Sequence, residues 1–153
     1  MQTAEAPSKI MPRPMFKTQY ENYIGGKWVP PVGGEYFNNE SPVDGSLIAK
    51  MPRSKAADVD LAVDAAHKAF ETWGKTSVTE RSKVLLQIAD VIEQNLEFLA
   101  RVETVENGKA LRETMAADMP LVVDHFRYFA GVIRAEEGSA TELNADTLSL
   151  IIK

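Results

Sequence analysis

The sequence contains no cysteine, which excludes disulfide bonds, cysteine–zinc sites and a thiol nucleophile from these 153 residues. It also lacks an excess of basic charge, because 17 lysines and arginines oppose 22 aspartates and glutamates. The resulting net charge of −5 argues against a general nucleic-acid-binding protein. No apolar run approaches the roughly 18 residues that a membrane-spanning helix needs, so we expect no membrane partner.

The N-terminal segment also lacks the continuous apolar stretch of a secretory signal peptide. It mixes polar and charged side chains with prolines. We therefore interpret residues 1–18 as a flexible tail. Because no export signal is present, we expect a cytoplasmic location.

Residues 19–53 have the pattern of short strands separated by turns. The Gly25-Gly26 pair can supply the positive φ angles of a tight hairpin turn. Further turns are predicted at Gly33-Gly34 and at residues 41–45, where proline and Asp-Gly occur together. The segment is predicted to form a small antiparallel meander of three strands.

In residues 54–138 the apolar residues recur at spacings of three and four positions, which predicts about four amphipathic helices. The expected starts are Ser54, Thr79, Asn95 and a segment near Ala110 that begins a fresh turn at Asp118. The expected glycine ends are Gly74, Gly108 and Gly138. Four carboxylates are interpreted as a solvated face of the first helix: Asp58, Asp60, Asp64 and Glu71.

Residues 139–153 are predicted to contain one apolar strand at 147–152, and the whole chain is assigned to the α+β class. This strand has no candidate partner nearer than the first 53 residues, and an uncovered apolar edge invites pairing. The helices likewise need a second layer over their apolar faces. Both features suggest that part of the chain is missing or that a partner covers these apolar surfaces.

No catalytic group of residues can be assembled from the sequence. His67 and His125 lie in different predicted helices without the ligand spacing of a metal site, so we interpret them as surface or interface residues. No G-x-G-x-x-G phosphate loop is present. The sequence therefore assigns no catalytic or cofactor-binding residue.

Six segments, taken in order, resemble the N-terminal part of an aldehyde dehydrogenase. Their sequences are most similar to those of bacterial acetaldehyde dehydrogenases. They are Tyr23–Trp28, Ser41–Gly45, Ala65–Trp73, Glu80–Glu93, Glu103–Lys109 and Phe126–Gly131. The resemblance implies NAD(P)-dependent oxidation of an aldehyde to a carboxylic acid through a cysteine thiolate. In the family, the cysteine, the glutamate that activates water and the dinucleotide loop all belong to regions after Lys153. We therefore expect a fragment that is inactive alone and binds no NAD or NADP by itself.

The resemblance also implies how this chain contributes to a larger subunit. Residues 54–138 would flank the cofactor-binding domain, and residues 139–153 would begin the oligomerisation region. The expected partners are the remainder of the subunit, neighbouring subunits of a homo-oligomer and an aldehyde substrate. The rival interpretation is a standalone helical interaction module derived from the same family.

The resemblance further implies a monovalent cation near Asn39, through its carbonyl, and Glu106, through its carboxylate. Family members often have Thr or Val at the first position and Asp at the second, so both positions depart from the common pattern. A remaining family ligand lies beyond Lys153. The alternative for Glu106 is a solvated carboxylate near a helix end.

Overall fold

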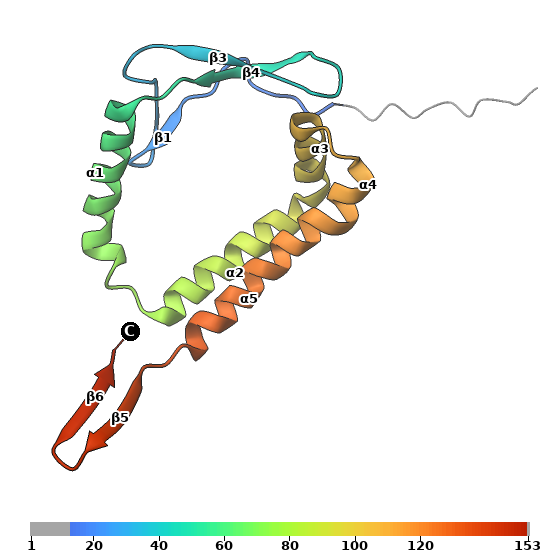
Figure 1. Ribbon diagram of the computed structural model, residues 1–153. Helices are drawn as coiled ribbons and strands as arrows, with labels where there is room; N and C mark the ends of the chain where they lie inside the picture. Colours follow the sequence, from blue (N-terminus) through green and yellow to red (C-terminus); the bar gives the residue numbers. More distant parts are fainter. Residues whose placement is uncertain (1–12, 153) are drawn as a thin grey trace, which may run out of the picture.

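The computed structural model describes residues 13–152 and confirms the α+β class. Two strand pairs come first, a run of helices follows, and a third strand pair ends the described chain (Figure 1). Residues 1–12 of the predicted tail and Lys153 lie outside the described residues.

The first strands form two separate antiparallel pairs. β1 (Asn22–Ile24) pairs with β2 (Lys27–Val29) around the Gly25-Gly26 turn, where both glycines have positive φ, as the sequence predicts. β3 (Tyr36–Glu40) pairs with β4 (Leu47–Pro52). A single three-stranded meander is therefore not what forms, because Pro30 and Pro31 interrupt the ladder after β2.

The chain before β1 connects the two pairs. The Tyr20 amide donates to the Lys50 carbonyl at 2.9 Å, and the Lys50 amide donates to the Thr18 carbonyl at 3.0 Å. These bonds make a parallel bridge beside β4. The N-terminal strands are thereby held next to one another without forming one continuous sheet.

The helix starts differ from the predicted ones in ways that side-chain bonds explain. α1 (Ala56–Trp73) begins after Lys55, because Ser54 donates to the side chain of Asn22 at 2.9 Å instead of capping the helix. α2 (Val78–Gln94) is capped by Ser77 and not by Thr79. Ser77 Oγ accepts from the Glu80 amide at 3.2 Å, and Glu80 accepts from the Ser77 amide at 3.0 Å. This reciprocal arrangement is a capping box.

The later helices follow closely on one another. α3 (Leu96–Asn107) ends at Gly108, which has a φ of +81°, as predicted. Asn95 does not cap α3 through its side chain, which instead donates back to the Val91 carbonyl of α2. α4 (Leu111–Glu113) continues through the π-helical turn η1 (Thr114–Asp118) into α5 (Met119–Ala135).

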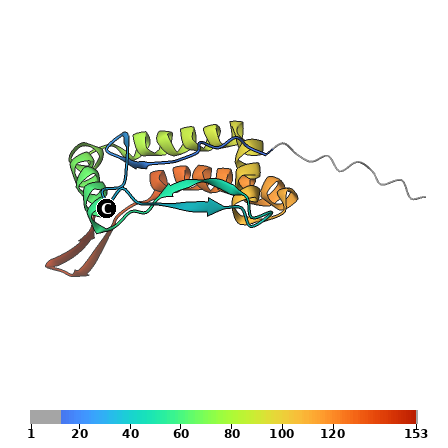
Figure 2. The ribbon, with the colours of Figure 1, turned by 90° about the horizontal axis from the view of Figure 1, so that it is seen from above.

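α2 and α5 run side by side in opposite directions, and this pair forms the main helical contact (Figures 1 and 2). Small buried side chains lie on both helices and allow the close approach: Ser82 and Ala89 on α2, and Val123 and Ala130 on α5. Ser82 Oγ donates to the Ala130 carbonyl at 2.7 Å. α1 stands apart from this pair and contacts β1 (Figure 1).

The C-terminal strand has a partner that the sequence interpretation missed. β5 (Ser139–Asn144) pairs with β6 (Thr147–Ile151) in a hairpin that projects away from the helices (Figure 1). The expectation that the last strand lacked a nearby partner is therefore wrong. The segment Ser-Ala-Thr-Glu-Leu-Asn does not alternate apolar and polar residues clearly enough to mark a strand.

Few large apolar side chains are enclosed within residues 13–152. The buried apolar residues are small: Ala49, Ala89, Ala100, Val123 and Ala130. Large side chains on α1 stay exposed, including Phe70 at 68% and Trp73 at 47%. The hairpin strands β5 and β6 are exposed at every position. Within the same range, no helix combines the length and apolar character required to cross a membrane.

Candidate functional site

The two sequence-predicted site residues meet in the structure although 67 positions separate them. Asn39 lies on β3 and Glu106 lies in the last turn of α3. Asn39 Nδ2 donates to Glu106 Oε1 at 3.0 Å. Glu106 therefore makes a tertiary contact with β3, while its side chain stays exposed to solvent at the end of α3.

The turn between β3 and β4 fixes this contact by docking on the end of α3. Ser41 is 2% exposed, and its Oγ donates to the Val105 carbonyl at 2.6 Å. Pro42 lies so close to Gly108 that an added Cβ at Gly108 would come within 3.2 Å of Pro42 Cγ. We call this region, made of Asn39, Ser41, Pro42 and residues 105–108, the β3–α3 junction.

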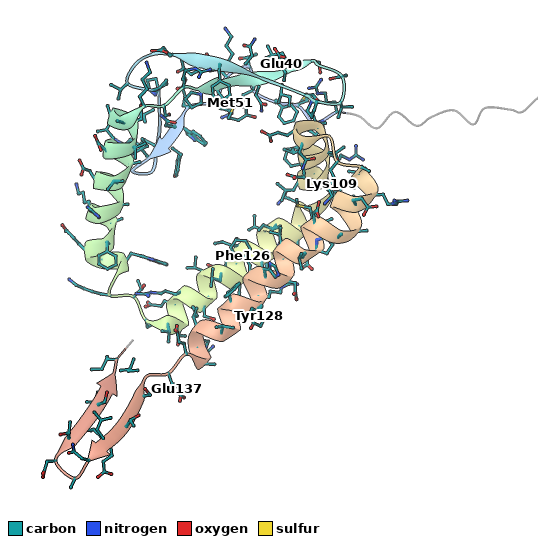
Figure 3. All side chains as sticks on the ribbon, in the orientation of Figure 1. Glu40, Met51, Lys109, Phe126, Tyr128 and Glu137 are labelled. Carbon is teal, nitrogen blue, oxygen red and sulfur yellow. The ribbon has the colours of Figure 1, made fainter. Side chains whose placement is uncertain are left out.

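A cavity of about 230 Å³ opens beside the β3–α3 junction. Its lining residues are Phe16, Tyr20, Asn39, Ile48, Ala49, Met51, Val102 and Glu106. Most of these side chains are apolar, so Asn39 and Glu106 stand out as a polar pair on an apolar wall. Figure 3 shows two residues near this region, Met51 on β4 and Lys109 just after α3.

The donor atoms at the β3–α3 junction suit a hard cation in type. Carboxylate and carbonyl oxygens are the ligands that such ions prefer. Among residues 13–152, no three His, Cys, Asp or Glu side chains gather closely enough to hold a metal ion. Asn39 and Glu106 therefore fit a cation only as part of a ligand set that includes other oxygen atoms.

Asp58 forms a second polar cluster that the sequence interpretation missed. It is 4% exposed, so assigning it to a solvated helix face was wrong. Its Oδ1 accepts from the Val32 amide at 2.7 Å and from Asn22 Nδ2 at 3.5 Å, and its Oδ2 accepts from the Lys55 amide at 2.8 Å. The bonds from the Lys55 and Val32 amides lower the pKa of Asp58 below its ordinary value.

The Asp58 cluster explains how α1 is attached to the strands. One carboxylate joins β1, the loop after β2 and the first turn of α1. Asp58 is the third residue of the helix, where an acidic side chain commonly bonds back to the cap amide, and that position was the available signal. With both oxygens accepting amide donors, the cluster has a structural explanation.

Comparison with known proteins gives the chain its relatives. The model of the aldehyde dehydrogenase family matches residues 28–153. An acetaldehyde dehydrogenase from Pseudomonas aeruginosa is 64% identical over 134 residues, and an aldehyde dehydrogenase from Deinococcus radiodurans is 60% identical over 134 residues. Each alignment covers 88% of this chain and 26% of the relative, so the chain spans about a quarter of their length.

Solved structures agree with the sequence relatives. The crystal structure of PnpE in complex with nicotinamide adenine dinucleotide has a TM-score of 0.81 and 40% identity, and the match covers 86% of this chain and 27% of that one. An aldehyde dehydrogenase described as putative, from Burkholderia cenocepacia, has a TM-score of 0.80 and 38% identity, covering 88% and 27%. A family model that matches most of the chain, together with these relatives, shows that the chain belongs to the aldehyde dehydrogenase family.

Proposed function

We propose that this chain provides the N-terminal part of an enzyme that oxidises an aldehyde to a carboxylic acid with NAD or NADP. The observation that carries the proposal is 60–64% identity to aldehyde dehydrogenases over nearly nine-tenths of the chain. Acetaldehyde is the proposed substrate, because a relative at 64% identity is an acetaldehyde dehydrogenase. A cytoplasmic location belongs to the same proposal.

The chemistry is proposed to come from outside these 153 residues. The sequence has no cysteine to act as a thiolate nucleophile. The cofactor, when bound to the complete enzyme, supplies the hydride acceptor. No residue of this chain is assigned to cofactor binding. The proposed role of the chain is to support the domain that binds the cofactor.

A chimera tests this assignment directly. The 134 aligned residues of the Pseudomonas aeruginosa acetaldehyde dehydrogenase would be replaced by the matching residues of this chain, and NADH formation from acetaldehyde would be followed by absorbance. We expect an active chimera and an inactive 153-residue chain. A folded chimera without activity, or aldehyde oxidation by the 153-residue chain alone, would contradict the proposal.

The exposed apolar faces favour a structural role for this chain within a larger subunit. Phe70 and Trp73 on α1, and Val91 on α2, are each close to half exposed or more. Burying side chains of this size contributes roughly 1.5–3 kcal/mol each, so covering these faces would add substantial stability. We propose that residues 54–138 flank the cofactor-binding domain and that residues 139–153 contribute to contacts between subunits of a homo-oligomer. The same exposure disfavours the standalone interaction module.

A monovalent cation at Asn39 and Glu106 completes the proposal. The 3.0 Å contact between the two side chains supports it, because it brings a carboxylate and the β3 strand together beside a cavity. The test compares thermal unfolding of the chimera, which supplies the rest of the subunit, in potassium chloride and in tetramethylammonium chloride at equal ionic strength. We expect a higher Tm in potassium, and no such difference in the chimera carrying Glu106→Gln. Equal Tm values for the unmodified chimera in both salts would overturn the cation site.

A further inference from the structure

The last turn of α3 ends in an Asn-Gly pair that the proposed function does not explain. Asn107 and Gly108 are both exposed, and Gly108 takes the left-handed conformation at a φ of +81°. Glycine has no Cβ, so its amide nitrogen is less hindered than that of other residues. An asparagine side chain before glycine is therefore open to attack by the following amide.

The reaction is hydrolytic and needs only water. The Gly108 nitrogen loses its proton to a solvent base and bonds to Asn107 Cγ. The Cγ–Nδ2 bond breaks, the amino group takes up a proton from solvent and leaves as ammonia, and a cyclic imide remains. Water then opens either C–N bond of the imide, which yields aspartate or isoaspartate at position 107.

The folded structure holds each participating group away from this reaction. The Gly108 amide donates to the Thr104 carbonyl at 3.0 Å. Asn107 Oδ1 accepts from the Lys109 amide at 2.7 Å, and Asn107 Nδ2 donates to the Glu103 carboxylate. Attack requires these bonds to break, so the rate should follow local opening of the last turn.

Conversion of Asn107 would disturb the helix end that the β3–α3 junction uses. A carboxylate at 107 would face Glu103, its present hydrogen-bond acceptor, and like charges four residues apart destabilise a helix. A new negative charge at a helix C-terminus is also unfavourable. The same turn carries Val105 and Glu106, which bond to Ser41 and Asn39.

We propose that Asn107 is a deamidation site gated by opening of the last α3 turn, and that its conversion weakens the β3–α3 junction. The modification adds a negative charge to a turn that already carries Glu103 and Glu106. The affected contacts are the Asn39–Glu106 and Ser41–Val105 bonds. The inference stands independently of the catalytic activity of the complete enzyme.

The first experiment measures deamidation in the folded chain and in urea at mildly alkaline pH, by mass spectrometry of peptides. We expect Asn107 to convert under both conditions, about tenfold or more slowly in the folded chain. Asn95 is the internal control, because it also ends a helix but precedes Leu96, and it should convert far more slowly than Asn107 in urea. Equal rates of Asn107 conversion in folded and unfolded chain, or an intact Asn107 in urea, would overturn the gated site.

The second experiment tests the consequence with Asn107→Asp and the matched variant Asn107→Ala. Both remove the amide donor to Glu103, and only the first adds the charge. Asn107→Ala also removes the acceptor of the Lys109 amide bond, so a lower Tm for Asn107→Asp cannot result from loss of that bond. We expect Asn107→Asp to have the lower Tm and the faster hydrogen exchange at the amides of residues 105–108. An Asp variant as stable and as protected as the Ala variant would overturn the effect on the junction.

Discussion

Arg127 on α5 forms a two-point ion pair with Glu93 on α2. Arg127 Nη2 lies 2.6 Å from Glu93 Oε2, and Nη1 lies 3.2 Å from Oε1. Nη2 also donates to Asp90 Oδ1 at 3.1 Å. Hydrogen bonding and charge from Arg127 lower the pKa of Glu93. One guanidinium thus connects two successive turns of α2 to the middle of α5.

The first prediction concerns the geometry of this pair. Arg127→Gln should lower the Tm only slightly, because the Arg127 and Glu93 side chains are 40% and 54% exposed, and exposed ion pairs contribute little. Thermal unfolding followed by circular dichroism measures the change at low and high salt. Arg127→Lys keeps the charge but not the forked geometry, so its Tm should fall between the Tm of the unmodified chain and that of Arg127→Gln. A Tm for Arg127→Lys below that of Arg127→Gln would contradict a role for the charge.

A second prediction follows from the lowered pKa of Asp58. A carboxyl group whose pKa is lower in the folded chain than in the unfolded chain stabilises the fold above its unfolded pKa of about 4. That contribution is lost as the pH falls below this value and through the folded pKa. Urea unfolding at a series of acidic pH values should therefore show falling stability, and Asp58→Asn should weaken the dependence. Asp60→Asn, on the exposed face of the same helix, should leave it nearly unchanged.

Local features of the fold could be predicted from the sequence where a short motif determines the backbone conformation. The Gly25-Gly26 turn and the Gly108 helix end were predicted, because positive φ is needed within one or two residues. Ser77 and Glu80 form an equally local capping box, so the predicted cap at Thr79 is wrong although the sequence carries the Ser-x-x-Glu pattern of the true cap.

Features that depend on tertiary contacts could not be predicted from local sequence motifs. The burial of Asp58 depends on Val32 and Asn22, which reach it from other segments. The resemblance selected Asn39 and Glu106, but only the docking of the β3–β4 turn on α3 shows that their side chains touch. Strand β5 was missed because its residues do not alternate clearly between apolar and polar, although they pair with β6 in the structure.

A third prediction tests the close contact between α2 and α5. Ser82→Ala removes the 2.7 Å bond to the Ala130 carbonyl and should cost about 1 kcal/mol of unfolding free energy. Urea unfolding is the measurement. Thr79→Ala is the matched control on the same helix, because Thr79 is exposed. If the two variants lose the same stability, the buried bond does not contribute as the structure indicates.

The last prediction compares two glycines whose backbone conformations differ. Gly108→Ala forces an L-residue to keep a φ of +81°, which costs roughly 1–2 kcal/mol. The new Cβ would also lie 3.2 Å from Pro42 Cγ, so the β3–β4 turn would have to shift away from α3. We expect a lower unfolding free energy and faster hydrogen exchange at residues 105–108.

Gly131→Ala is the matched substitution with the opposite expected sign. Gly131 lies inside α5 with a negative φ, and a Cβ built there meets no atom within 4 Å. Alanine is favoured over glycine in a helix interior by about 0.8–1.0 kcal/mol, so this variant should unfold at higher urea concentration. Because the chemical change is identical at both positions, a difference in sign isolates the backbone conformation and the contact with Pro42. Destabilisation of similar size in both variants would instead mean that the added methyl group, and not the left-handed end of α3, determines the outcome.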